Sequence, residues 1–156
     1  MGVNITNRIL GEAKDKRLTD PQQAYYYARN IIKGPFPKGE AVIATNPLWA
    51  YQYARYVIKG PFPEGEEAIA TDTRWSYYYA REVIKGRWPS GEAAIAKDSQ
   101  DAYYAYYYAK NVIKGRFPEA EEAMAKDSYY ANLYLELFPE AKIDWYAREW
   151  IDWTKL

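Results

Sequence analysis

A motif that starts with Tyr-Ala-Arg or Tyr-Ala-Lys and runs through Ile-Lys-Gly to an aromatic residue, Pro and Glu occurs four times in this chain. Its glycines stand at positions 34, 60, 86 and 115, so successive copies are 26, 26 and 29 residues apart. A fixed period of this length is typical of solenoids, in which each repeat buries its apolar face only against its neighbours. The period therefore predicts an all-α fold, an α-solenoid of tandem helix-turn-helix repeats.

The first half of each repeat has the pattern of an amphipathic helix. In the first copy Asp20 is a suitable N-cap, and Pro21 suits the first helical position. The apolar residues that follow lie at i, i+3, i+4, i+7 and i+8, on one face of a helix; they are Ala24, Tyr27, Ala28, Ile31 and Ile32. We expect this helix to end near Lys33, with Gly34 in the left-handed conformation that stops it.

The second half of each repeat predicts a shorter helix, from Pro37 to about Thr45 in the first copy. An aromatic residue precedes each short helix, and we expect it to fill the gap between the two helices of its repeat. These residues are Phe36, Phe62, Trp88 and Phe117.

The sequence departs from the period in two places. The last step carries three extra residues between Ser99 and Tyr104, which predicts that the fourth long helix starts one turn earlier. After Met124 the motif decays. We therefore expect an N-terminal cap (residues 1–19), four repeats (residues 20–127) and a degenerate repeat with a capping helix (residues 128–156), the helix running from about Pro139 to Trp153.

Composition excludes several classes of function. The chain has no Cys and no His, so thiolate chemistry, imidazole bases and common zinc sites are ruled out. Adjacent carboxylates such as Glu66 and Glu67 point apart on a helix, and each motif glycine stands alone rather than in a phosphate-binding loop. We therefore expect a non-enzymatic protein without a cofactor, a metal or catalytic residues.

Charge and hydropathy bear on partners and location. Lys plus Arg and Asp plus Glu are 21 each, which argues against a nucleic-acid binder because such proteins need a basic excess. No apolar run approaches a membrane span, and no signal peptide is recognisable, so we expect a cytoplasmic protein without membrane association. Residues 117–156 hold nine acidic and four basic residues, an asymmetry that suits head-to-tail assembly or is ordinary surface variation.

Aromatic positions that vary between repeats are the best candidates for a binding surface. Tyr is the commonest aromatic residue, with 18 copies, and packing does not determine a position that changes from repeat to repeat. Rigid aromatics with polar tips suit protein recognition or stacking on a nucleotide base, whereas partial burial between repeats is the structural alternative. The candidates are Tyr26, Trp49, Tyr56, Trp75, Tyr78, Tyr103, Tyr104 and Tyr107.

Recurring cations form a second candidate surface, a basic stripe. An Arg or Lys follows each Tyr-Ala, and a Lys stands four residues later on the same helix face. A stripe could hold anionic ligands; the structural alternatives are dipole-complementing lysines and bridges between Arg29 and Glu40 and their equivalents. The stripe comprises Arg29, Lys33, Arg55, Lys59, Arg81, Lys85, Lys110 and Lys114.

The repeated string, over about residues 20–127, resembles a tandem-repeat family of uncharacterised proteins from tailed bacteriophages. The family brings no established activity, so no functional residue follows from the resemblance. It implies a viral origin and expression in a bacterial host cytoplasm.

Three functions follow as hypotheses. The first is a non-enzymatic protein-binding protein that inhibits a bacterial defence system by occluding a host protein. The second is sequestration of a nucleotide-like signalling ligand between aromatic and basic side chains. The third, drawn from the charge asymmetry, is a virion or scaffolding component.

Overall fold

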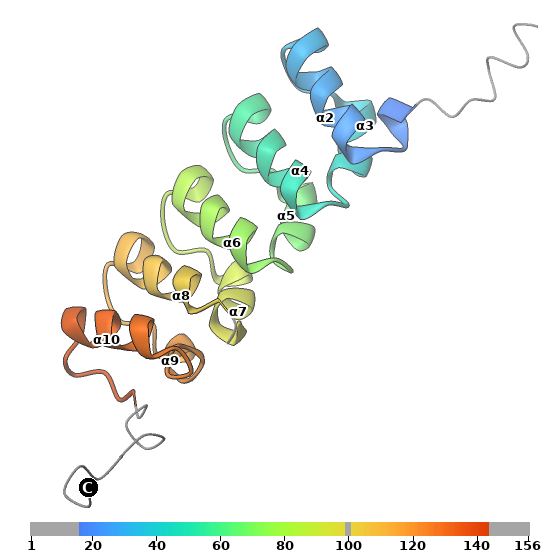
Figure 1. Ribbon diagram of the computed structural model, residues 1–156. Coiled ribbons are helices and arrows are strands. Elements are labelled where there is room, and N and C mark those ends of the chain that lie inside the picture. The colour runs from blue at the N-terminus through green and yellow to red at the C-terminus, as the bar shows by residue number, and fades with distance from the viewer. Residues whose placement is uncertain (1–15, 99–100, 144–156) are drawn as a thin grey trace, which may run out of the picture. The chain divides into compact units, whose positions relative to one another are not determined.

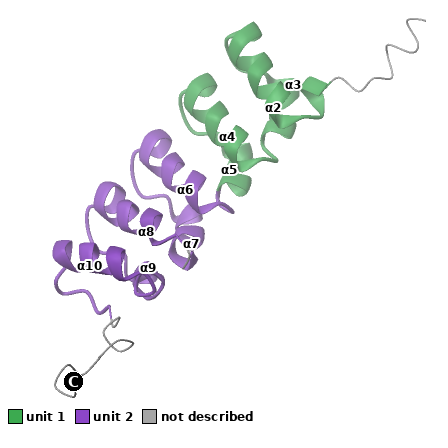
Figure 2. Ribbon diagram, viewed as in Figure 1, with its two compact units in different colours: residues 1–69 green, residues 70–156 purple. Residues whose placement is uncertain are grey.

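The computed structural model describes residues 16–98 and 101–143, and in this part of the chain all regular secondary structure is helical (Figure 1). Long and short helices alternate and pack against their neighbours in sequence order, which confirms the all-α repeat fold. The chain divides into two compact units, residues 1–69 and residues 70–156 (Figure 2). Most of the predicted N-terminal cap and most of the predicted C-terminal helix lie outside the described residues.

Unit 1 contains two repeats, preceded by the short 3₁₀ turn η1 (Lys16–Leu18). Its first long helix is α2 (Pro21–Tyr26) continued by η2 (Tyr27–Ile32), and its second is α4 (Pro47–Tyr53) continued by η3 (Ala54–Ile58). The short helices are α3 (Pro37–Ile43) and α5 (Pro63–Ile69). Helix α2 packs against α3 and α4, and α3 packs against α5, so long helices form one layer and short helices a second.

Unit 2 contains two further repeats and a shortened fifth one. The long helices are α6 (Thr73–Tyr79) with η4 (Ala80–Ile84), α8 (Ala102–Tyr108) with η5 (Ala109–Ile113), and α10 (Ser128–Leu137). The short helices are α7 (Pro89–Lys97) and α9 (Pro118–Met124). Helix α8 contacts α6 and α10, and α9 contacts α7, which repeats the two-layer arrangement of unit 1 (Figure 2).

Side-chain caps start the long helices as the sequence predicts. The carboxylate of Asp20 accepts the backbone N–H of Gln23 at 3.0 Å, and Asp72 accepts that of Trp75 at 3.0 Å. The insertion before the fourth long helix behaves differently from the prediction. Helix α8 begins at Ala102, directly after Asp101, and has seven residues like α6, so it gains no turn; the short helix α7 before it has nine residues where α5 has seven.

The second half of each long helix is π-helical, which the sequence analysis did not anticipate. The backbone N–H of Lys33 bonds to the carbonyl of Ala28, five residues back, and the N–H of Gly34 bonds to the same carbonyl. The left-handed residue is then Lys33, with φ of 59°, so the prediction of a left-handed Gly34 is wrong. Its equivalents share the conformation; they are Lys59, Lys85 and Lys114.

The π-helical turns also break the predicted apolar stripe. A π-turn holds more residues than an α-turn, so positions after Ala28 drift away from the face that Ala24 and Ala28 bury. Ala24 and Ala28 are fully buried, but Ile31 is 68% exposed and Ile32 41%. The buried stripe of the first repeat therefore ends at Ala28, whereas the equivalents of Ile31 and Ile32 in the next three repeats, such as Val57 and Ile58, are half-buried.

A tyrosine hydroxyl joins each described repeat to the one before it within its unit. The hydroxyl of Tyr53 accepts the backbone N–H of Phe36 at 2.7 Å and donates to the carboxylate of Glu40 at 2.7 Å. Tyr108 makes the same two bonds, to the N–H of Trp88 at 2.9 Å and to Glu92 at 2.8 Å. Because Tyr53 and Tyr108 are fully buried, these bonds satisfy polar groups that water does not reach.

The aromatic residue before each short helix fills the gap between the two helices, as predicted. Phe62 and Phe117 are buried, and Phe36 lies against the ring of Tyr27 at 5.2 Å. A glycine three residues later makes room for the ring. A Cβ atom at Gly39 would lie 2.3 Å from the ring of Phe36 and 3.3 Å from the Cβ of Ala24.

The fifth repeat lacks the π-helical turns of the first four. Helix α10 runs straight to Phe138, whose backbone N–H bonds to the carbonyl of Tyr134 at 2.8 Å. Tyr134 itself caps the fourth repeat, because its hydroxyl accepts the N–H of Phe117 and donates to Glu121. Residues 139–143 are not helical, so the predicted helix does not begin at Pro139.

Candidate functional site

Five of the predicted aromatic candidates form one continuous chain of ring contacts in unit 2, here called the aromatic ladder. Its members, in order of contact, are Trp75, Tyr78, Tyr104, Tyr103 and Tyr107. Successive ring centroids lie 6.1, 6.3, 4.9 and 4.5 Å apart. Such spacings are those of mutually attractive aromatic pairs, so the rings hold one another in place.

Exposure differs along the ladder. Trp75, Tyr78, Tyr103 and Tyr107 are half-buried, which leaves part of each ring for a partner. Tyr104 is buried, with 8% exposure, and burial raises the pKa of its phenol. Its hydroxyl accepts from the Nε of Arg74 at 3.0 Å. Tyr104 therefore supports the ladder from beneath, and its placement on the binding surface is wrong.

Sequence reasoning missed Tyr130, which extends the ladder. Its ring centroid lies 6.0 Å from that of Tyr103 and 5.8 Å from that of Tyr106. Tyr130 stands three residues after the cap Asp127, the position that Trp75 holds after Asp72. Counting from the caps would have found it, although the rest of the fifth repeat has decayed.

The aromatic candidates of unit 1 separate into two groups. The rings of Tyr26 and Trp49 lie 5.6 Å apart, and both contact Tyr25. Tyr56 lies instead between two guanidinium groups, with the Cζ of Arg29 4.8 Å and that of Arg55 4.9 Å from its ring centroid. Tyr26 is 41% and Tyr56 40% exposed, so both present ring surface to solvent.

The Arg positions of the basic stripe are held by tyrosines one turn earlier. Arg29 donates to the hydroxyl of Tyr25 at 2.6 Å, and Arg81 donates to that of Tyr77 at 3.1 Å. The predicted bridge from Arg29 to Glu40 is not formed, because Glu40 bonds to Tyr53. The buried tyrosines were not singled out from the sequence, although they recur in four repeats; they are Tyr25, Tyr51, Tyr77 and Tyr106.

The Lys positions of the stripe are exposed and strained. A left-handed conformation costs a non-glycine residue about 1–2 kcal/mol, yet each of the four π-helical segments ends on a left-handed Lys. Within the described residues these lysines make no ion pair or side-chain hydrogen bond. Their charges offset the negative ends of the helix dipoles, but that role does not require the left-handed position.

A cavity of about 220 Å³ opens in unit 2 where η4 lies beside η5. Three cations line it, Arg81, Lys85 and Lys114, together with Gly86, Asn111 and Val112. The Asn111 amide donates to the hydroxyl of Tyr77 at 3.2 Å, the same hydroxyl that anchors Arg81. The buried Tyr77 therefore fixes two of the cavity's polar groups from below.

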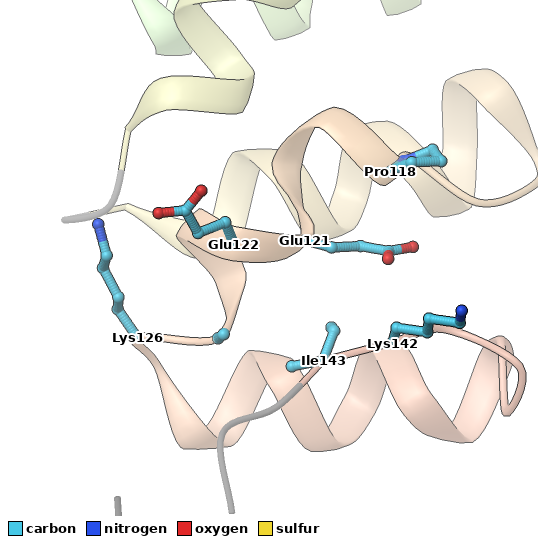
Figure 3. Close-up of a pocket in the computed structure, with 7 residues that line it drawn as sticks. Pro118, Glu121, Glu122, Lys126, Lys142 and Ile143 are labelled. Atoms are coloured by element: carbon cyan, nitrogen blue, oxygen red, sulfur yellow. The ribbon is translucent and has the colours of Figure 1, made fainter. Parts of the chain in front are cut away.

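Two other cavities of unit 2 have mixed or acidic linings. One, of about 400 Å³, lies between α9 and the segment after α10, and in it Lys142 lies across from Glu121 (Figure 3). Glu121 is already engaged by Arg116 and by Tyr134. The other, of about 460 Å³, is lined by Thr71, Asp72, Thr73, Arg74, Trp75, Asp98, Asp101 and Tyr104.

The described residues contain no group of three or more acidic side chains placed to hold a metal ion. The helices of the described chain are all too short or too polar to cross a bilayer. Comparisons with protein-family models, with curated proteins and with solved structures found no match.

Proposed function

We propose that this protein is a non-enzymatic binding protein that holds a partner protein against the aromatic ladder of unit 2. The observation that carries the proposal is the ladder itself: four half-buried Trp and Tyr rings on α6 and α8, joined through the buried ring of Tyr104. Trp, Tyr and Arg are the residues that most often dominate the energy of protein interfaces.

The rigidity of the ladder supports the proposal. Tyr103 contacts Tyr104, Tyr107 and Tyr130, and Tyr104 is tied to Arg74. A partner therefore orders few side chains when it binds, and the entropy cost of about 0.5–1.5 kcal/mol for each immobilised side chain is largely avoided. Tyr side chains also offer a hydroxyl at the rim of each ring for hydrogen bonds.

The partner that we propose is a protein of a bacterial host, which the chain occludes to block a defence system. This part of the proposal rests on the resemblance to the phage repeat family. The protein surface it would cover is one with apolar or aromatic groups that insert between the rings, because the half-buried ladder offers ring faces rather than net charge.

The test is capture of a partner by wild-type protein and by a ladder variant, Tyr103→Ser/Tyr107→Ser. We expect the variant to bind the captured partner at least about 20-fold more weakly, since interface hot spots contribute 2 kcal/mol or more. The matched control is Tyr26→Ser, which removes a 41% exposed ring of unit 1 that is not part of the ladder. Equal affinity of wild type and ladder variant, with both folded by circular dichroism, would overturn the proposal.

A further inference from the structure

The cationic cavity between η4 and η5 is not used by the proposed interface. It lies one turn beyond the ladder, because Asn111 follows Tyr107 by four residues on the same helix. Arg81, Lys85 and Lys114 converge on it. The only acidic side chain that the described residues place against these cations is Glu82, 3.7 Å from Arg81.

The net charge at the cavity remains positive after every opposing group is counted. The three cations are opposed by Glu82 and by the ends of two helices, each equivalent to roughly half a negative charge. The balance is roughly one positive charge. Three like charges around one small volume repel one another, so a compact anion in the cavity relieves that repulsion.

Lys85 and Lys114 share the left-handed conformation of Lys33 and Lys59, and these two in addition line the cavity. Both are left-handed, with φ of 60° and 56°, and both are followed by a Gly that could take the left-handed position without strain. Within the described residues neither lysine has a partner that would explain its retention there. Lining the cavity is the role that the structure gives to these two side chains.

The equivalent place in unit 1 holds a different side chain at the position of Asn111. Arg29, Lys33 and Lys59 correspond to the three cations, and Tyr56 corresponds to Asn111. The ring of Tyr56 lies under the guanidinium of Arg29, at 4.8 Å. The smaller Asn111 leaves room in unit 2 and adds an amide to the cavity wall.

We propose that this cavity binds a phosphoryl group. Arg81 would contact its oxygens with a planar guanidinium already oriented by Tyr77, and Lys85 and Lys114 would supply ammonium charges on either side. A dianion of this kind matches the three cations better than a carboxylate does, and about 220 Å³ accommodates it. The phosphoryl group belongs to a small molecule, either free phosphate or pyrophosphate or a mononucleotide.

The first experiment titrates inorganic pyrophosphate into the full chain, at constant ionic strength, and follows the backbone amides by NMR. We expect saturable shifts at Lys85, Asn111 and Lys114. Shifts that spread evenly over all lysines, or none at these residues, would overturn the proposal. The variant Lys85→Gly is expected to bind at least about tenfold more weakly, and the control Lys33→Gly to stay within about twofold of wild type.

Exchanging the side chains at positions 56 and 111 changes no charge. It therefore distinguishes binding in the cavity from general electrostatic attraction to the cations. Asn111→Tyr keeps every cation and fills the cavity, so we expect binding to weaken at least about tenfold. Tyr56→Asn is expected to create a second site, with new shifts at Lys33 and Lys59. If Asn111→Tyr is stably folded and binds pyrophosphate with the affinity of the wild type, the proposal is wrong.

The source of the phosphoryl group is distinguished by comparing pyrophosphate with adenosine monophosphate. If Tyr107→Ser weakens the mononucleotide alone, the base stacks on the ladder and a nucleotide is the ligand. If both probes bind alike and Tyr107→Ser affects neither, the site recognises the phosphoryl group only. The ladder variant shares no residue with Lys85→Gly or Asn111→Tyr, so failure of pyrophosphate binding leaves the proposed protein interface standing.

Discussion

The two units carry the same repeat but present different chemistry at equivalent positions. In unit 1 Tyr56 fills the space beside Arg29, whereas in unit 2 Asn111 leaves a cavity beside Arg81. The backbone around both places is alike, since the left-handed lysines have φ within a few degrees of one another. Equivalent positions of the repeated frame therefore carry a stacked aromatic side chain in unit 1 and an amide that lines a cationic cavity in unit 2.

A second difference lies at the start of the short helices. In unit 2 Arg87 donates to Glu92 at 2.8 and 2.7 Å, and Arg116 makes the same bidentate contact with Glu121. In unit 1 the equivalent position of the first repeat is Pro35, which cannot make it. The glutamate of a repeat in unit 2 thus has two partners, where Glu40 in unit 1 has only Tyr53 within the described residues.

The largest effect is expected from removing the joining hydroxyl in each unit. Tyr53→Phe leaves the N–H of Phe36 and the carboxylate of Glu40 without their partner and should cost about 3 kcal/mol. Tyr108→Phe should cost about 2 kcal/mol, because Glu92 keeps Arg87. Urea denaturation and hydrogen exchange at the Phe36 and Trp88 amides measure both. An equal cost in the two units would mean that the arginine contact does not support the glutamate.

The next effect concerns Gly39, the glycine that makes room for the ring of Phe36. Gly39→Ala places a Cβ 2.3 Å from the ring of Phe36, and we expect a loss of between about 1 and 2 kcal/mol from overpacking. The equivalent residue of the fourth repeat is already alanine, Ala120, which is fully buried. Ala120→Gly is the matched control and should cost about 0.5–1 kcal/mol, as expected for glycine in a helix. Thermal unfolding measures both losses of stability. A larger loss for Ala120→Gly than for Gly39→Ala would show that the ring of Phe36 moves aside without cost.

A smaller effect of opposite sign is expected at the left-handed lysines. Lys33→Gly and Lys85→Gly should each stabilise the chain by about 0.5–1 kcal/mol, because glycine adopts a positive φ without strain and only part of this gain is lost with the dipole contact. Equal gains are expected in the two units, since φ is 59° and 60°. Differential scanning calorimetry of the two variants is the measurement. Destabilisation at Lys85 alone would indicate a structural contact of that side chain.

The smallest effect is a pH dependence confined to unit 2. The bond from Arg87 lowers the pKa of Glu92 below its ordinary value, so its contribution to stability is present above pH 4.5 and is lost as the pH falls below that value. Arg87→Pro, which copies unit 1, should remove about 0.5 kcal/mol at neutral pH and flatten the acid dependence of Trp88 amide exchange. The guanidinium is half exposed, which limits the magnitude. Phe36 exchange should not change.

Local signals in the sequence predicted the parts of the fold that depend on neighbours within one turn. Asp20 and Asp72 cap their helices because a short side chain reaches the N–H three residues on, and that rule needs no tertiary structure. The role of Phe36 in filling the gap between two helices was predicted because an aromatic residue precedes each short helix. The all-α repeat fold followed from the period alone.

Features that depend on the backbone's own geometry or on distant residues were not predictable in this way. The preference of glycine for the left-handed region pointed to Gly34, yet the π-helical turns move the stop one residue earlier, to Lys33. The bond between Tyr53 and Phe36 joins residues 17 positions apart, and the cavity depends on Arg81 and Asn111 meeting across two repeats. The aromatic ladder was predicted as a set of residues, but its order and the burial of Tyr104 needed the packed helices.

The tyrosine that joins neighbouring repeats sets an order in which their hydrogen bonds can form during synthesis. The hydroxyl of Tyr108, which bonds to the amide of Trp88 and the carboxylate of Glu92, is synthesised after both of them. The amide of Phe117 likewise bonds to the later residue Tyr134. In a nascent chain, the hydrogen bonds of one repeat are therefore completed only after the next repeat has been synthesised. Phe138 ends this dependence, because its amide is satisfied by the carbonyl of Tyr134 from the same helix. Among the described residues, the synthesis of α10 supplies the last of these joining tyrosines, Tyr134.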